Sequence, residues 1–140
     1  MEVQAYLVFD GRCEEALEFY KKAIGAEVVR VMRNKDNPEP APPGTLPPGS
    51  ENKIMHSTFR VGETTIMASD GYAQGNPRFE GFSLSLSAAN DAETERLFKA
   101  LAEGGQVRVP LAKSFFASKF GMLADKFGVG WIVITSGPVH

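Results

Sequence analysis

Residues 53–71, KIMHSTFRVGETTIMASDG, decide the fold that the sequence predicts. Side chains in the first half alternate between two sides: Met55, Ser57, Phe59 and Val61 on one, and Ile54, His56, Thr58 and Arg60 on the other. This period of two is typical of a half-buried strand. Gly62 and Glu63 supply a two-residue turn, and Thr64–Ser69 returns as a second strand. The hairpin carries His56, one of only two histidines, and ends on the carboxylate of Asp70.

The composition excludes several classes of protein. The chain has 140 residues, 43% of them hydrophobic and 23% charged, which fits one globular domain. A net charge of −2 without a basic stripe argues against nucleic acid as a partner. The N-terminal stretch lacks the features of a signal peptide, and no apolar run approaches the about 18 residues of a membrane span. Cys13 is the single cysteine, so there is no internal disulfide, and we expect a cytoplasmic protein without membrane contact.

Ahead of the hairpin, the sequence predicts a strand, a helix and a second strand. Residues 3–9 and 26–33 are short apolar runs rich in β-formers. Helical spacing over residues 14–24 ends at Gly25, a C-cap signal. One face of this helix is apolar: Cys13, Ala16, Tyr20 and Ala23.

Residues 34–52 differ from everything around them. They hold six of the nine prolines: Pro38, Pro40, Pro42, Pro43, Pro47 and Pro48. With almost no apolar residues, this Pro-rich loop is not expected to form a packed element. Two interpretations stay open, a mobile surface loop and a lid over a pocket.

The second half begins again with a strand and a helix. Residues 81–88 alternate as a strand, and Asn90 followed by Glu93 predicts a capped helix start. The helix runs to about Glu103 and ends at two glycines. Four further short strands are predicted at residues 106–109, 113–118, 119–124 and 131–135.

The two halves resemble each other at an offset near 78. Gly25-Ala26-Glu27-Val28 matches Gly104-Gly105-Gln106-Val107, and Tyr20-Lys21 matches Phe98-Lys99. The chain is therefore predicted to be a single domain of two βαβββ modules, residues 1–72 and 80–136. Paired modules place the helices outside and leave the inner sheet faces around a shared concavity.

Short motifs, in order along nearly the whole chain, resemble a known family. They are residues 6–11 (YLVFDG), 14–20 (EEALEFY), 54–56 (IMH), 66–71 (IMASDG), 81–86 (GFSLSL), 110–111 (PL), 120–122 (FGM) and 125–129 (DKFGV), with Trp131. The chain is similar to the vicinal oxygen chelate superfamily of glyoxalase I, fosfomycin-resistance proteins, bleomycin-binding proteins and extradiol dioxygenases, and within it to the PhnB-like branch. The resemblance implies an α+β fold of two βαβββ modules forming a curved mixed sheet around a cleft, assembled as a homodimer.

Some PhnB-like proteins carry a ubiquinone methyltransferase label. No strand of this sequence is followed by the glycine-rich turn expected of an S-adenosylmethionine site. The sequence therefore argues against methyl transfer.

The resemblance also implies where a divalent metal would bind. Enzymes of the superfamily carry His or Glu ligands on the first and fourth strands of the two modules. Carried over position by position, these fall on Ala5, Phe82 and Ile132, whose side chains cannot bind a metal. The fourth-strand position of the first module falls near residues 68–70, where Asp70 is a single carboxylate. We expect no catalytic metal and no other cofactor.

Six residues are candidates for a ligand-binding pocket: His56, Asp70, Ser83, Ser85, Phe116 and Trp131. Each also has a structural interpretation. His56 can be a bonded histidine of the sheet, and Asp70, like Asp125, can begin a turn. The late aromatic residues can be core or dimer surface, or line an apolar cleft. Cys13 is expected to pack as a small apolar side chain, because Glu14 and Glu15 oppose a reactive thiolate.

The leading hypothesis is a metal-free protein that binds a small molecule in the sheet concavity. The alternative is an enzyme of the same superfamily, a lyase, isomerase or dioxygenase, with a non-standard site at His56 and Asp70. A structural protein with a filled concavity is a third possibility. The enzyme gains support if His56 and Asp70 point into one cleft, and loses it if a helix covers His56.

Overall fold

The computed structural model describes residues 1–39, 42–73 and 76–137. The chain divides into two compact units, Met1–Pro77 and Arg78–His140. Each unit contains one strand, one α-helix and three further strands in that order, so the predicted α+β fold of two βαβββ modules is confirmed. The strands form two four-stranded mixed sheets, one in each module.

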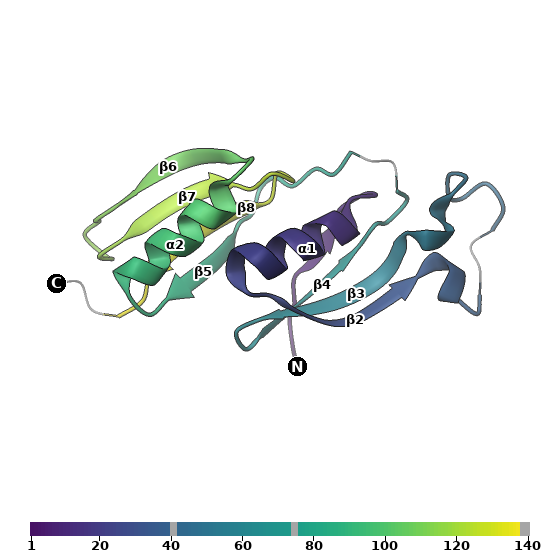
Figure 1. The fold of residues 1–140 in the computed structure, drawn as a ribbon, viewed down its shortest axis with the longest axis horizontal. Coiled ribbons are helices and arrows are strands. Elements are labelled where there is room, and N and C mark those ends of the chain that lie inside the picture. Colours follow the sequence, from purple (N-terminus) through teal and green to yellow (C-terminus); the bar gives the residue numbers. More distant parts are fainter. Residues whose placement is uncertain (40–41, 74–75, 138–140) are drawn as a thin grey trace. The chain divides into compact units, whose positions relative to one another are not determined.

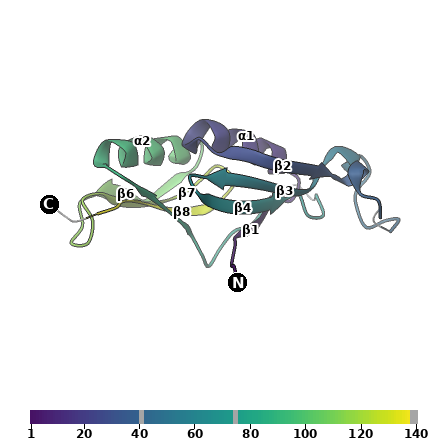
Figure 2. The same ribbon diagram turned by 90° about the horizontal axis from the view of Figure 1, so that it is seen from below.

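The first module comprises β1 (Tyr6–Val8), α1 (Cys13–Ile24), β2 (Glu27–Arg33), β3 (Ile54–Val61) and β4 (Thr64–Ser69). Its strand order is β1-β4-β3-β2, with β1 parallel to β4 and the other pairs antiparallel. Figures 1 and 2 show α1 lying across one face of this sheet. The predicted hairpin is confirmed as β3 and β4, joined at Gly62 and Glu63.

The core of the first module lies between α1 and its sheet. The predicted helix face is buried, and Leu17 joins it. Tyr20 stacks on Phe59 of β3 with ring centroids 5.8 Å apart, and neither residue is exposed. Ser57 shares this buried face, as the alternation predicts.

Two irregularities in the pairing of β2 with β3 modify that alternation. Val28 pairs with Phe59, Arg30 with Thr58, Met32 with His56, and Arg33 with Ile54. Val29 is therefore an extra, unpaired residue in β2, and Met55 is an extra, unpaired residue in β3. The prediction that Ile54 shares the side of His56 was wrong: Ile54 is buried, because the bulge at Met55 reverses the alternation.

The second module comprises β5 (Leu84–Ala88), α2 (Asp91–Ala102), β6 (Gln106–Ala112), β7 (Phe120–Ala124) and β8 (Gly130–Thr135). Its strand order is β5-β8-β7-β6, and β5 is parallel to β8. Helix α2 packs Leu97, Phe98 and Leu101 towards the sheet. A Cβ on Gly121 of β7 would lie 2.6 Å from the Phe98 ring, so only glycine allows this close approach of helix and strand.

One predicted strand is absent. Residues 113–118 form a turn, in which the amide of Ala117 donates to Ser114 Oγ at 3.1 Å and the amide of Ser114 donates to the carbonyl of Ala117 at 3.0 Å. The hydroxyl offers the backbone a local alternative to a strand ladder. The preceding strand, β6, is longer than predicted and continues through Pro110, which an edge strand tolerates.

The Pro-rich loop is more ordered than predicted in its described part. It begins and ends with single 3₁₀ turns, Asn34–Asp36 and Ser50–Asn52. Asn34 Nδ2 donates to the carbonyl of Ser50 at 2.8 Å and ties the two ends together. The loop encloses an open cavity of about 380 Å³. Residues 40 and 41, with Pro40, lie outside the described residues.

Helices α1 and α2 have 12 residues each. No helix in the part of the chain that the structure describes is long and apolar enough to cross a membrane.

Candidate functional site

The face of the first sheet opposite α1, here called the open face, carries most of the accessible polar groups of that sheet. Strand register sets Tyr6 beside Met67, Met67 beside Thr58, and Thr58 beside Arg30, so one row crosses all four strands. Neighbouring residues such as Leu7 point to the buried face. By the same alternation the open face consists of Tyr6, Val8, Glu27, Arg30, Met32, His56, Thr58, Arg60, Thr65, Met67 and Ser69.

His56 and Tyr6 form a hydrogen-bonded pair on this face. The Tyr6 hydroxyl lies 3.2 Å from His56 Nδ1, and the two rings are 5.6 Å apart, centroid to centroid. Tyr6 is 45% exposed and His56 is half-buried. His56 therefore lies on the side of the sheet away from α1, where its imidazole can meet a solute.

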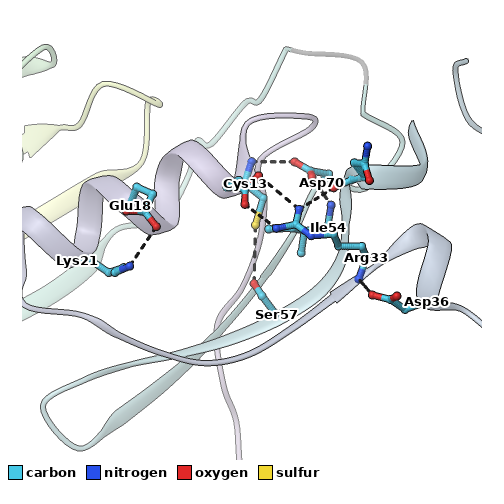
Figure 3. A network of polar contacts seen from close by, with 10 residues as sticks. Cys13, Glu18, Lys21, Arg33, Asp36, Ile54, Ser57 and Asp70 are labelled. Carbon is cyan, nitrogen blue, oxygen red and sulfur yellow. Dashed lines mark hydrogen bonds and ion pairs between the residues drawn. The ribbon is translucent and has the colours of Figure 1, made fainter. Parts of the chain in front are cut away.

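Asp70 is not part of that pair. It is 1% exposed, and both carboxylate oxygens accept backbone N–H groups. Oδ1 accepts from Gly11 at 3.1 Å and Cys13 at 2.8 Å, and Oδ2 accepts from Ile54 at 2.6 Å (Figure 3). The carboxylate thus joins the start of α1, the start of β3 and the end of β4, and the structure does not bring His56 and Asp70 into one cleft.

Cys13 lies in the same buried region. Its Sγ is 3.8 Å from Ser57 Oγ, and the side chain is fully buried (Figure 3). Burial raises the pKa of the Cys13 thiol to about 12. At neutral pH the thiol stays protonated, which gives no nucleophile, in line with its expected role as a small apolar residue.

The second sheet also has a face opposite its helix. Ser85 lies beside Ile132, and Ile132 beside Met122, while Ser87 and Phe120 flank Ile134. Ser85 is exposed on this face, and Ser83 is half-buried just before β5. Phe116 is 46% exposed in the turn before β7 and packs edge-on against Phe120 at 5.0 Å between centroids.

Trp131 lies on the other face of the second sheet. It is 3% exposed, shares the α2 side with Val133, and donates from Nε1 to Asp125 Oδ2 at 2.9 Å. Asp125 is itself buried and accepts the amides of Phe127 and Val129. Burial and hydrogen bonding favour the structural interpretation of both residues: Trp131 packs in the core, and Asp125 fixes the turn before β8.

The side chains present do not fit the metal of the superfamily. Ala5 precedes β1 and alternates onto the buried face with Leu7, so Tyr6 is the open-face residue of the first strand. Phe82 precedes β5, and Ile132 lies opposite the α2 side of β8, as its predicted position requires. Within residues 1–39, 42–73 and 76–137, no group of three or more His, Cys, Asp and Glu could hold a metal ion. His140 lies outside the described residues.

The sequence did not suggest Tyr6, Met67 or Arg30 as candidate site residues. Tyr6 lies between the apolar residues Ala5 and Leu7, and this alternation could have predicted that Tyr6 faces away from the core. The partners of Tyr6 across the sheet depend on register, and the placement of Arg30 depends on the bulge at Val29. Neither can be read from one sequence.

Residues 1–134 match the family described as 3-demethylubiquinone-9 3-methyltransferase. The chain belongs to this family. It is 31% identical to the protein YjdN of Escherichia coli, over 95% of this chain and 94% of that one. Among solved structures, protein PA1353 of Pseudomonas aeruginosa is 40% identical with a TM-score of 0.83, covering 97% of this chain and 98% of that one.

The fold neighbours agree with the predicted fold. The PhnB protein of Bacillus cereus matches with a TM-score of 0.79 and 30% identity, over 97% of this chain and 100% of that one. The fosfomycin resistance protein FosX of Mesorhizobium loti matches with a TM-score of 0.64 over 98% of this chain and 92% of that one. At 11% identity FosX shows the fold alone. The chain is therefore PhnB-like in sequence and fold, and it shares the fold of the fosfomycin resistance protein.

Proposed function

We propose that this protein binds a small organic molecule on the open face of the first sheet, without a catalytic metal. The observation that carries the proposal is the hydrogen-bonded pair of Tyr6 and His56 on a face away from the helix. A hydroxyl and an imidazole together can both donate and accept hydrogen bonds. Val8 and Met67 beside them offer apolar contact to the body of a ligand.

The face of the second sheet offers the same kind of surface. Ser85 supplies a hydroxyl beside Ile132, and Phe116 and Phe120 supply aromatic contact. We include Ser83, Ser85 and Phe116 as candidate ligand contacts of the second module.

An enzyme remains the alternative, in the lyase, isomerase or dioxygenase classes of the superfamily. His56 is the candidate proton acceptor, because its imidazole is half-exposed on the open face beside the Tyr6 hydroxyl. Two observations weigh against it. Asp70, the expected partner, accepts three backbone amides, and the positions expected for metal ligands carry Ala5, Phe82 and Ile132.

Methyl transfer, which the family description names, has less support. The strand-to-helix connections of the two modules are residues 9–12, FDGR, and residues 89–90, AN. Neither is the glycine-rich turn that would cradle a nucleotide-like cofactor.

The proposal extends to assembly and location. β2 and β6 are edge strands of their sheets, and they expose Val29, Val31, Val107 and Val109. A second copy would cover such edges, so we infer a homodimer, which light scattering on the purified protein would measure. A single buried thiol is compatible with the cytoplasm.

A fragment screen followed by two-dimensional ¹H–¹⁵N NMR tests the binding site. We expect hits that shift the amides of β1, β3 and β4 on the open face, and that bind Tyr6→Phe and His56→Ala several-fold more weakly. Tyr72→Phe is the matched control, because Tyr72 is an exposed tyrosine outside the sheet. Hits that never shift these amides would contradict the proposal.

Elemental analysis tests the metal. Protein purified without chelators should contain far less than one equivalent of Zn, Ni, Mn or Fe. A stoichiometric metal that also raises the melting temperature would overturn the metal-free proposal.

A further inference from the structure

Arg30 stands out on the open face of the first sheet. It is exposed, and its register partner is Thr58. The other arginine of this face, Arg60, donates to Glu27 at 2.6 Å in an ion pair. Among the described residues, Arg30 has no such partner. Glu27 is also the only acidic residue of the open face, so the face carries an uncompensated positive charge.

A β-bulge puts Arg30 there. Val28 pairs with Phe59 on the buried side, and Val29 is the extra residue of β2. In a regular ladder without the bulge, Val29 would pair with Thr58, and Arg30 would pair with Ser57 and point towards α1. Bulges commonly re-aim a side chain at functional sites. The bulge in β2 therefore interrupts the strand pairing and places the Arg30 guanidinium on the open face.

Arg30 lies close to the Tyr6–His56 pair. Because Arg30 pairs with Thr58 and Met32 with His56, Arg30 and His56 are diagonal neighbours on adjacent strands. Such neighbours lie about 7–8 Å apart, within the reach of an arginine side chain. Tyr6 and Arg30 therefore lie in one row across the sheet, with Met67 and Thr58 between them, and His56 lies in the neighbouring row.

We propose that the open face of the first sheet recognises a small organic anion, with its carboxylate on Arg30 and its apolar or aromatic body over Met67 and Tyr6. A guanidinium binds a carboxylate through two parallel charge-assisted hydrogen bonds. His56 and the Tyr6 hydroxyl add hydrogen bonds next to the charge. This inference rests on the proposed function and names the chemical class of its ligand.

Benzoate and benzamide are matched probes of this inference, since they share a ring and differ in charge. In ¹H–¹⁵N NMR titrations of the full chain, benzoate should shift the amides of Arg30, His56 and Thr58 saturably. Benzamide should bind about tenfold more weakly, as expected for one charge-assisted contact. Arg30→Met should lower benzoate affinity to the benzamide level, and Arg30→Lys should retain part of the preference.

Arg78→Met is the charge control, because it also removes one positive charge but lies in the other compact unit. It should leave both affinities unchanged. Arg30→Gln serves as a second variant if Arg30→Met does not fold. Loss of the benzoate preference in the Arg78 variant as well would overturn the inference, because the preference would then follow net charge.

The other outcomes separate the two proposals. If benzamide binds these amides as tightly as benzoate, or if only neutral fragments do, the anion inference falls and the proposed function stands. If no fragment of any charge shifts these amides, both fall.

Discussion

The two helices of the molecule begin in different ways. Asn90, the N-cap residue of α2, accepts the amide of Glu93 at 2.9 Å, so four consecutive residues hold this helix start. Arg12, at the N-cap of α1, makes no such side-chain bond. Instead, the amide of Cys13, the first residue of α1, donates to Asp70, which lies 57 residues further along the chain. The second helix start is local, whereas the first depends on the completed fold of its module.

This difference explains a misleading feature of the hairpin. Asp70 lies near a histidine in the sequence and ends a strand, which suggests chemistry. The buried carboxylate accepts the amides of Gly11, Cys13 and Ile54. Cys13 needs such an acceptor because the first amides of a helix have no partner within it. The open face is left to Tyr6 and His56.

The largest expected effect is that of Asp70→Ala. It removes the acceptor of three backbone amides at once, and each unsatisfied buried group costs about 1–3 kcal/mol. We expect the free energy of unfolding in urea to fall by about 3–5 kcal/mol. Asp36→Ala is the control, since this exposed carboxylate accepts one amide, that of Arg33, among the described residues. A loss no larger than that of the control would refute the role of Asp70.

The thiol of Cys13 reports on the same helix start. Because its pKa is raised to about 12 by burial, alkylation at pH 8 should require opening of this region. Iodoacetamide should react with Asp70→Ala about a hundredfold faster than with the unmodified chain, which corresponds to about 3 kcal/mol of easier opening. Asn90→Ala, which changes only α2, should leave the rate as it is. Equal rates in all three proteins would show that Asp70 does not hold α1.

Removal of the local cap should cost less. Asn90→Ala takes one acceptor from an exposed helix end, and we expect a loss of about 1 kcal/mol in urea unfolding. Asn90→Asp should be close to neutral, because both side chains cap well. If Asn90→Ala destabilises as much as Asp70→Ala, the contrast between local and long-range capping fails.

The smallest expected effect concerns an ion pair near α1. Arg33 donates to Glu14 at 2.6 Å, and this hydrogen bond lowers the pKa of the Glu14 carboxyl. A lowered folded pKa adds stability above the unfolded pKa, which is lost as pH falls through the folded value. Glu14 is 64% exposed, so we expect only a few tenths of a kcal/mol. Glu14→Gln should lower the urea midpoint at pH 7 and not at pH 3, whereas an equal change at both pH values would contradict the pair.

Local signals in the sequence predicted much of the fold. The hairpin at residues 53–71, the apolar face of α1 and the cap at Asn90 all depend on neighbours within a few residues, and all were confirmed. The strand predicted at residues 113–118 was wrong, because Ser114 turns the chain where the aromatic pattern looked extended.

The candidate site was harder to predict. Strand register sets Tyr6 beside Met67, and a single extra residue, Val29, decides the face of Arg30. Period-two patterning groups Trp131 with Val133 but does not say which face of β8 meets α2. Strand register and the face that each residue takes therefore depend on contacts between residues far apart in the sequence, which period-two patterning does not reveal.

The central claim is that the open face of the first sheet binds a small organic anion beside Tyr6 and His56. Methyl labelling of the five methionines tests it most directly, because Met67 and Met32 lie on this face, whereas Met122 lies on the second sheet. With benzoate bound, we predict intermolecular nuclear Overhauser effects from its ring protons to the methyl group of Met67, and their loss in Arg30→Met. Contacts to Met122 alone, or to no methionine, would contradict the account.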